Sequence, residues 1–242
     1  MVPAWLAFFD GMLAVTLVLV GIIGAHFYFT PPFFGFQLFL FGFLLSVLGL
    51  ILGLLGLLMT RSPARRSVRP RALIGTVLSL VIAVPIFAML TQRGKVPAIN
   101  DITTDFENPP EYVHAVELAP NQGRDMKYNR DKYMAAQQKG YPPLGPATVA
   151  ADPAAVFERV KTVATSIPDW QTTYEDPKTM TLEGVSTSHL FHFQDDFVIQ
   201  VRPGPNGTSL VEMRSKSRDG IGDFGVNYKR IVMFFDKLQA AG

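Results

Sequence analysis

The chain has 242 residues, a formal net charge of +2 and no cysteine. Without cysteine, disulfide bonds and thiolate chemistry are excluded. Residues 92–242 carry 17 lysines and arginines against 19 aspartates and glutamates, and this near-neutral balance argues against a nucleic-acid-binding protein.

Three long apolar runs precede Thr91, over Ala4–Gly24, Phe36–Met59 and Ala72–Leu90. Each run is long enough to cross the hydrocarbon core of a bilayer as a helix. The first run lacks the basic start of a signal peptide and carries Asp10, so we expect it to be a permanent anchor. The sequence therefore predicts a multi-pass membrane protein with membrane lipids as partners.

The segment between the second and third runs fixes the expected orientation. It contains no acid and five arginines, Arg61, Arg65, Arg66, Arg69 and Arg71. Because loops rich in arginine and lysine stay in the cytoplasm, this loop and the N-terminus are predicted to be cytoplasmic. The part after Thr91 then lies outside, so we expect a bacterial inner-membrane protein with a periplasmic C-terminal domain.

Small residues recur along the second run at alternating steps of four and three. They are Gly42, Ser46, Gly49, Gly53, Gly56 and Thr60. This spacing places them on one helix face, where small side chains let helix backbones approach closely in lipid. We predict a packing seam against either the other two runs or another subunit.

Two further features of the anchor each have two readings. Asp10 lies about two turns inside the first run, where a lone carboxylate is costly. It is read either as a proton or ligand site or, as favoured here, as a partner of Arg69 or Arg71. The nine aromatic residues of the segment 27–43 favour a belt at the external interface. A contact with a quinone, pigment or neighbouring subunit is the alternative.

Residues 92–146 are rich in Pro, Asn, Asp and Tyr and show little periodicity, apart from a short polar helix predicted over Arg124–Gln138. Connections this long are uncommon without regular structure. We therefore expect this extended linker to be held against the domain, the membrane or a partner.

Residues 147–242 predict a separate domain. Asp152 and Pro153 begin a helix with an apolar stripe that ends near Ile167, and a last helix is expected over Gly225–Gln239. The expected strands are Ala147–Ala150, Trp170–Glu175, Thr179–Ser186, Phe197–Arg202 and Thr208–Ser217. The order β-α-β-β-β-β-α predicts an antiparallel sheet with both helices on one face. The fold class is a membrane-anchored α+β protein, with a three-helix anchor over residues 1–91.

Parts of this C-terminal sequence resemble a known family. They are residues 97–105 with the following Asn108-Pro109-Pro110, and residues 195–202 and 214–230. Together they resemble the family catalogued as domain of unknown function 1499, and the three-span anchor resembles that of its membrane-bound proteobacterial members. Other members carry a cysteine pair near the start of the domain, which this chain lacks. The resemblance implies family membership and no particular activity.

A row of basic residues is the candidate contact surface of the domain. Arg214, Lys216 and Arg218 alternate along one expected strand and so project from the same face. If the helices cover the other face, this row and the turn with Gly220 and Gly222 lie exposed, ready to bind a lipid phosphate or an acidic partner. The alternative is a solvated set of charges balanced by Asp195, Asp196 and Glu212.

Two other motifs lack the structural context that their usual functions require. The spacing of Gly220, Gly222 and Gly225 is that of a dinucleotide-binding loop, but no second parallel strand follows, and we expect a tight turn with Asp223 capping the last helix. On a strand, His189 and His192 would point to opposite faces and could not share a metal. With no nucleophile elbow in the sequence, we predict a protein without a cofactor, metal or catalytic activity.

Two functions remain. The first is a non-enzymatic accessory, assembly or stabilising subunit of a larger envelope or energy-transducing membrane complex. The second is a tethered module that binds a lipid or another hydrophobic ligand. An apolar cavity between sheet and helices would favour the second function, and a filled core would favour the first.

Overall fold

A computed structural model describes residues 2–92 and 96–242 of the chain. It forms two compact units, one of Met1–Gly94 with His189–His192 and one of Lys95–Ser188 with Phe193–Gly242. The first unit contains three α-helices, α1 (Val2–His26), α2 (Pro32–Met59) and α3 (Arg69–Gln92). All three are long and apolar enough to span a membrane, as the sequence predicts. A short 3-10 helix over Pro63–Val68 precedes α3.

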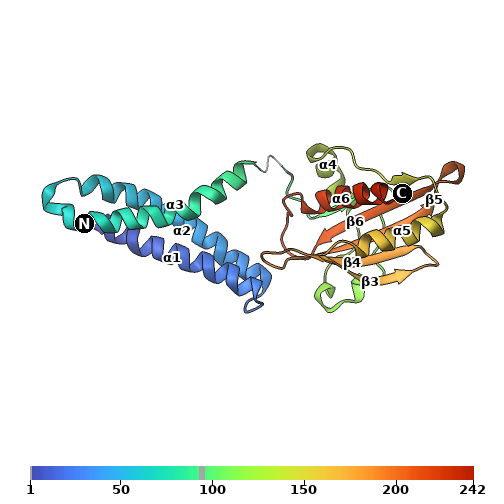
Figure 1. The fold of residues 1–242 in the computed structure, drawn as a ribbon, viewed down its shortest axis with the longest axis horizontal. Coiled ribbons are helices and arrows are strands. Elements are labelled where there is room, and N and C mark those ends of the chain that lie inside the picture. The colour runs from blue at the N-terminus through green and yellow to red at the C-terminus, as the bar shows by residue number, and fades with distance from the viewer. Residues whose placement is uncertain (1, 93–95) are drawn as a thin grey trace. The chain divides into compact units, whose positions relative to one another are not determined.

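The second unit is built on one six-stranded sheet. Its strands are β1 (Asp101–Thr103), β2 (Ala147–Val149), β3 (Trp170–Asp176), β4 (Thr181–Thr187), β5 (Gln194–Pro203) and β6 (Ser209–Ser217). The strand order is β1-β6-β5-β4-β3, with β2 also pairing with β6, and every pair is antiparallel. Helices α5 (Pro153–Thr165) and α6 (Val226–Ala240) cover one face of the sheet (Figure 1). The predicted α+β fold is confirmed.

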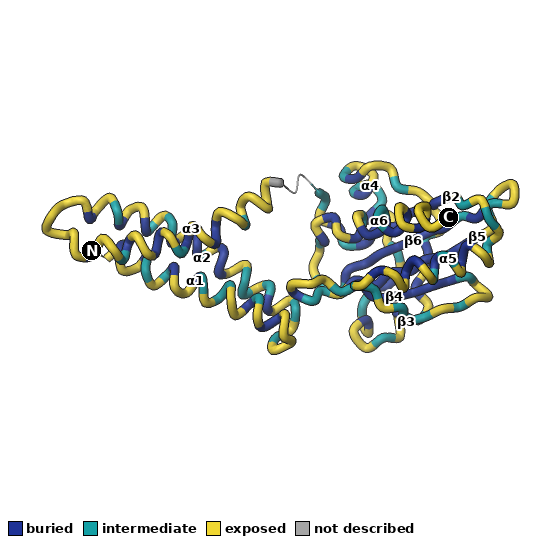
Figure 2. The backbone as a smooth tube through the Cα atoms, viewed as in Figure 1, coloured by how far each residue is buried: buried dark blue, intermediate teal, exposed yellow. Residues whose placement is uncertain are grey.

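The main core lies between this face and the two helices. Asp152 accepts hydrogen bonds from the backbone N–H groups of Ala154 and Ala155, which caps α5 as the sequence predicts. The apolar stripes of both helices pack against alternate residues of β4, β5 and β6, among them Leu182, Phe197, Ile199, Val211 and Met213. Figure 2 shows these three strands largely buried.

The other face of the sheet is also covered. Residues 104–129, which the sequence leaves in the linker, contribute a small second core in which Tyr112, Ala115 and Met126 pack on Val198. The same segment begins at β1 and continues into α4 (Arg130–Gly140), a helix close to the one predicted over Arg124–Gln138. Residues 104–129 thus form an outer layer on the second face of the sheet.

Candidate functional site

The basic row lies on the face covered by residues 104–129. Arg214 and Glu183 are the cross-strand neighbours of Val198 there, whereas Phe197 and Ser215 face the helices. Arg214 is fully buried and Lys216 is 7% exposed. The prediction that Arg214, Lys216 and Arg218 lie on an exposed face is wrong, because the outer layer covers that face.

Asp101 of β1 pairs with two members of the row. Its carboxylate accepts two hydrogen bonds from Arg214, from Nε at 2.9 Å and from Nη2 at 2.8 Å. Lys216 Nζ donates to the same carboxylate at 2.9 Å. Two cations thus share one fully buried carboxylate, so loss of that carboxylate would leave both cations buried without a counter-charge.

Arg218 pairs with Asp196 on the neighbouring strand. Its Nη2 and Nε donate to the carboxylate of Asp196 at 2.7 Å and 3.0 Å. From the outer layer, Asn121 Nδ2 donates to the same carboxylate at 3.1 Å and Arg124 lies 3.5 Å from it. The charges that were expected to bind a partner therefore fasten the outer layer to the sheet.

Tyrosine rings complete the surroundings of Arg214. Its guanidinium lies 4.9 Å from the ring centre of Tyr112 and 5.4 Å from that of Tyr128, an arrangement that stabilises a buried cation. Burial raises the pKa of both tyrosines well above the usual value of 10.0. Both rings therefore stay neutral, and Tyr112 donates a hydrogen bond to the backbone oxygen of Asp196 at 2.9 Å.

Asp195 and Asp196 point to opposite faces, as expected of neighbours on a strand. Asp195 pairs with Arg230 of α6, and Arg230 also donates to Ser215 Oγ at 2.9 Å. The two carboxylates are thus held on opposite faces by separate arginines.

The turn after β6 has the capping geometry predicted from its sequence. Gly220 and Gly225 have φ angles of 76° and 82°, which glycine adopts without strain. The carboxylate of Asp223 accepts hydrogen bonds from the backbone N–H groups of Gly225 and Asn227, both at 2.8 Å. Burial raises the pKa of Asp223, although these hydrogen bonds act in the opposite direction. Gly222 packs closely on Ala98, so the turn is a structural junction.

The part of the chain that contains this network matches a family model. A family model described as "Protein of unknown function (DUF1499)" matches residues 101–238, more than half of the chain. The chain belongs to the DUF1499 family. The match begins at β1, ends in α6 and includes the outer layer, so the DUF1499 domain comprises nearly all of the second unit. No curated protein matches the chain.

Glu183 of the DUF1499 domain is a buried charged residue that the sequence analysis did not single out. It is fully buried, and its carboxylate accepts hydrogen bonds from the successive backbone N–H groups of Val113, His114 and Ala115, the last at 2.6 Å. The available signal was one acid within the otherwise apolar stretch Leu182–Val185. Glu183 fixes the conformation of the outer layer around residues 113–117.

The small-residue seam of α2 packs within its own helical unit. A Cβ atom added at Gly42 would lie 2.8 Å from the backbone oxygen of Ala14, and one at Gly56 would lie 3.0 Å from Ala72 Cβ. Gly53 abuts Thr76, and Ser46 is fully buried. Of the two partners that the sequence left open, the seam contacts α1 and α3.

Asp10 lies at this seam and not beside the arginines. Its Oδ2 and Ser79 Oγ both lie next to Gly49, are buried and have no hydrogen-bond partner in the described residues. Arg71 instead lies over the ring of Trp5, 4.1 Å from its centre. The expected pair of Asp10 with Arg69 or Arg71 is therefore not formed in the described part of the chain.

Within residues 2–92 and 96–242, no group of three His, Asp or Glu side chains could hold a metal ion. One cavity of about 400 Å³ lies beside α4 and is lined by Phe106, Gln137, Gln138, Pro142, Pro143 and Leu144. A second, of about 530 Å³, lies at the surface of α5 and β3. Apart from Leu144, which packs against the main core, neither is lined by residues of the core between the sheet and the helices α5 and α6.

Proposed function

We propose that this DUF1499 protein is a non-enzymatic accessory or assembly subunit of a larger envelope or energy-transducing membrane complex. The charged side chains best suited to chemistry, those of Asp101, Asp196 and Arg214, are used in internal ion pairs. Asn121 and Arg124 of the outer layer contact the same Asp196, and Arg214 donates to the backbone oxygen of Met126. These contacts hold the outer layer in one arrangement on the sheet, which suits a rigid docking domain better than a reaction site.

The observation that carries the proposal is the fixed turn at residues 113–117. Val113 and Val116 are 53% and 41% exposed, yet the backbone between them is held by the buried carboxylate of Glu183. His114 stacks on Tyr174 with ring centres 5.7 Å apart. Exposed apolar side chains on a preorganised backbone are typical of protein contact sites.

The alternative function, binding of a lipid or other hydrophobic ligand, has less support. The region between the sheet and α5 and α6 is filled by core side chains. The cavity beside α4 is large enough for a small ligand, but Gln137 and Gln138 make its lining partly polar.

The partner test compares the exposed valines of this turn with an exposed residue elsewhere on the domain. We expect the double variant Val113→Ser and Val116→Ser, purified in mild detergent, to lose at least one protein that co-purifies stoichiometrically with the native chain. The control Lys178→Ser, at the exposed turn between β3 and β4, should keep it, and thermal unfolding should be similar in all three proteins. If the same proteins, or none, accompany every form, the accessory role is contradicted. Co-purified lipid without protein would favour the alternative.

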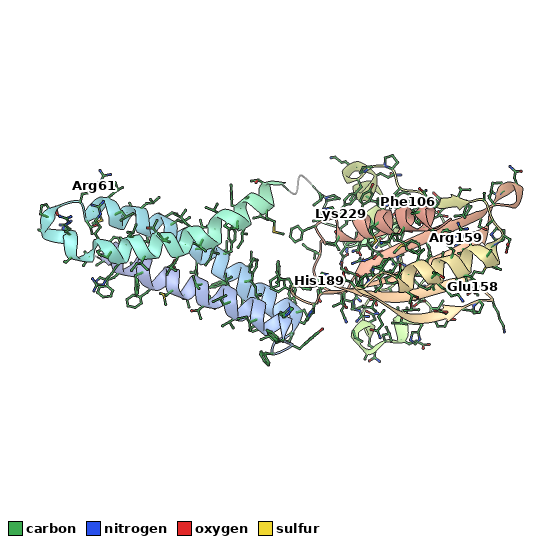
Figure 3. All side chains as sticks on the ribbon, viewed as in Figure 1. Arg61, Phe106, Glu158, Arg159, His189 and Lys229 are labelled. Carbon is green, nitrogen blue, oxygen red and sulfur yellow. The ribbon has the colours of Figure 1, made fainter. Side chains whose placement is uncertain are left out.

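We further propose that the protein lies in the bacterial inner membrane with the DUF1499 domain in the periplasm. Five arginines support this orientation, three between α2 and α3 and two in the first turn of α3, and Arg61 is labelled in Figure 3. Alkaline phosphatase fused after Gly242 should therefore be active, because it folds only outside the cytoplasm. An inactive fusion, together with an active cytoplasmic reporter at the same position, would reverse the orientation.

A further inference from the structure

The turn between β6 and α6 displays apolar side chains to solvent. Ile221 is 84% exposed, and Phe224 and Val226 are 48% and 45% exposed. Large aliphatic side chains rarely gather in this way on a water-facing turn, and exposed apolar clusters mark contact sites. Among the described large hydrophobic residues, Ile221 has the highest exposed fraction.

The turn holds these side chains in a fixed arrangement. Phe224 has a φ angle of 54°, a left-handed conformation that is uncommon for a bulky residue and is kept only where the surroundings enforce it. The enforcing contacts are the hydrogen bonds to the Asp223 carboxylate described above. Asn100 also donates from Nδ2 to the backbone oxygen of Gly220 at 2.7 Å, and the N–H of Asp223 donates to the oxygen of Ile99 at 3.1 Å.

The segment that packs on this turn follows the third apolar helix closely in the sequence. A Cβ atom added at Gly225 would lie 3.6 Å from Val96 Cγ1, and one at Gly222 would lie 3.1 Å from Ala98 Cα. The helix α3 ends at Gln92, and the four residues from there to Val96 span at most about 14 Å in any conformation. The segment that packs on the turn therefore follows the apolar span after only a few residues of chain.

We propose that the turn Gly220–Val226 inserts its apolar side chains into the lipid interface of the membrane that the three helices span. The exposed Lys229, labelled in Figure 3, follows Val226 by three residues. At this helical spacing the two side chains are neighbours on one face of α6. A cation beside an apolar tip suits the boundary between anionic headgroups and acyl chains. This contact concerns lipid and is independent of the protein-facing turn at residues 113–117.

The absence of cysteine makes the test direct. A single Ile221→Cys variant of the full chain, labelled with the environment-sensitive dye NBD, is reconstituted into vesicles of phosphatidylethanolamine and phosphatidylglycerol. We expect a blue-shifted emission and strong quenching by nitroxide groups attached high on the lipid acyl chains. A Lys178→Cys control, at the exposed turn between β3 and β4, should show neither effect.

A second variant separates the effect of the turn from that of the dye. Phe224→Asn in the labelled background keeps a residue that tolerates positive φ but removes the ring, and it should reduce the quenching. Emission and quenching equal to those of the Lys178→Cys control would overturn the proposal. A blue shift seen only in native membranes, without quenching by lipid nitroxides, would also overturn it, because a protein would then cover the turn.

Discussion

Replacing Asp101 by Asn should destabilise the DUF1499 domain by about 3–5 kcal/mol, because the change leaves Arg214 and Lys216 buried without their shared counter-charge. The unfolding transition can be followed by the fluorescence of Trp170, which packs on Phe197 and Phe234. A Trp5→Phe background removes the only other tryptophan.

The control for this change is an ion pair at the surface. Glu158→Gln breaks the pair with Lys161, in which the Glu158 side chain is 68% exposed, and should cost less than about 1 kcal/mol. Figure 3 shows Glu158 on α5. If both variants lose the same small amount of stability, the buried network does not hold the outer layer in place.

Replacing Gly53 by Leu should destabilise the helical unit by at least about 1–3 kcal/mol, since any side chain at this position would overlap Thr76 of α3. Resistance of the helices to unfolding in sodium dodecyl sulfate, measured by circular dichroism, reports the change.

Val47→Leu is the matched control on the same helix. Val47 is 41% exposed within the chain, so an added methylene group meets no neighbouring backbone and should leave the unfolding midpoint unchanged. A Gly53→Leu protein as stable as this control would show that α2 does not need close contact with α3.

The sequence predicts well wherever a pattern is local. Apolar length identifies the three spans, and the alternation of side chains along β6 correctly separates Arg214 from Met213. The cap at Asp152 marks the start of α5. These signals need only neighbouring residues, so they are readable without knowledge of the fold.

The sequence did not show which segment of the chain covers each face of the sheet. Strand alternation assigns Arg214 to a face, but Asp101 lies 113 residues earlier in a strand of only three residues. A strand this short has no periodicity to detect. Likewise, membrane depth suggested Arg69 or Arg71 as partners of Asp10, whereas helix packing places it beside Gly49 and Ser79.

The outer layer has a consequence for biosynthesis. The strands β1 and β2 both pair with β6. Both are therefore synthesised well before the strand with which they pair. Until β6 has been synthesised, Asp101 lacks both Arg214 and Lys216, and β1 has no strand with which to pair. Folds that depend on such distant pairings form slowly and expose apolar surface meanwhile. A nascent DUF1499 domain is therefore most vulnerable to proteases and aggregation before its last strand appears.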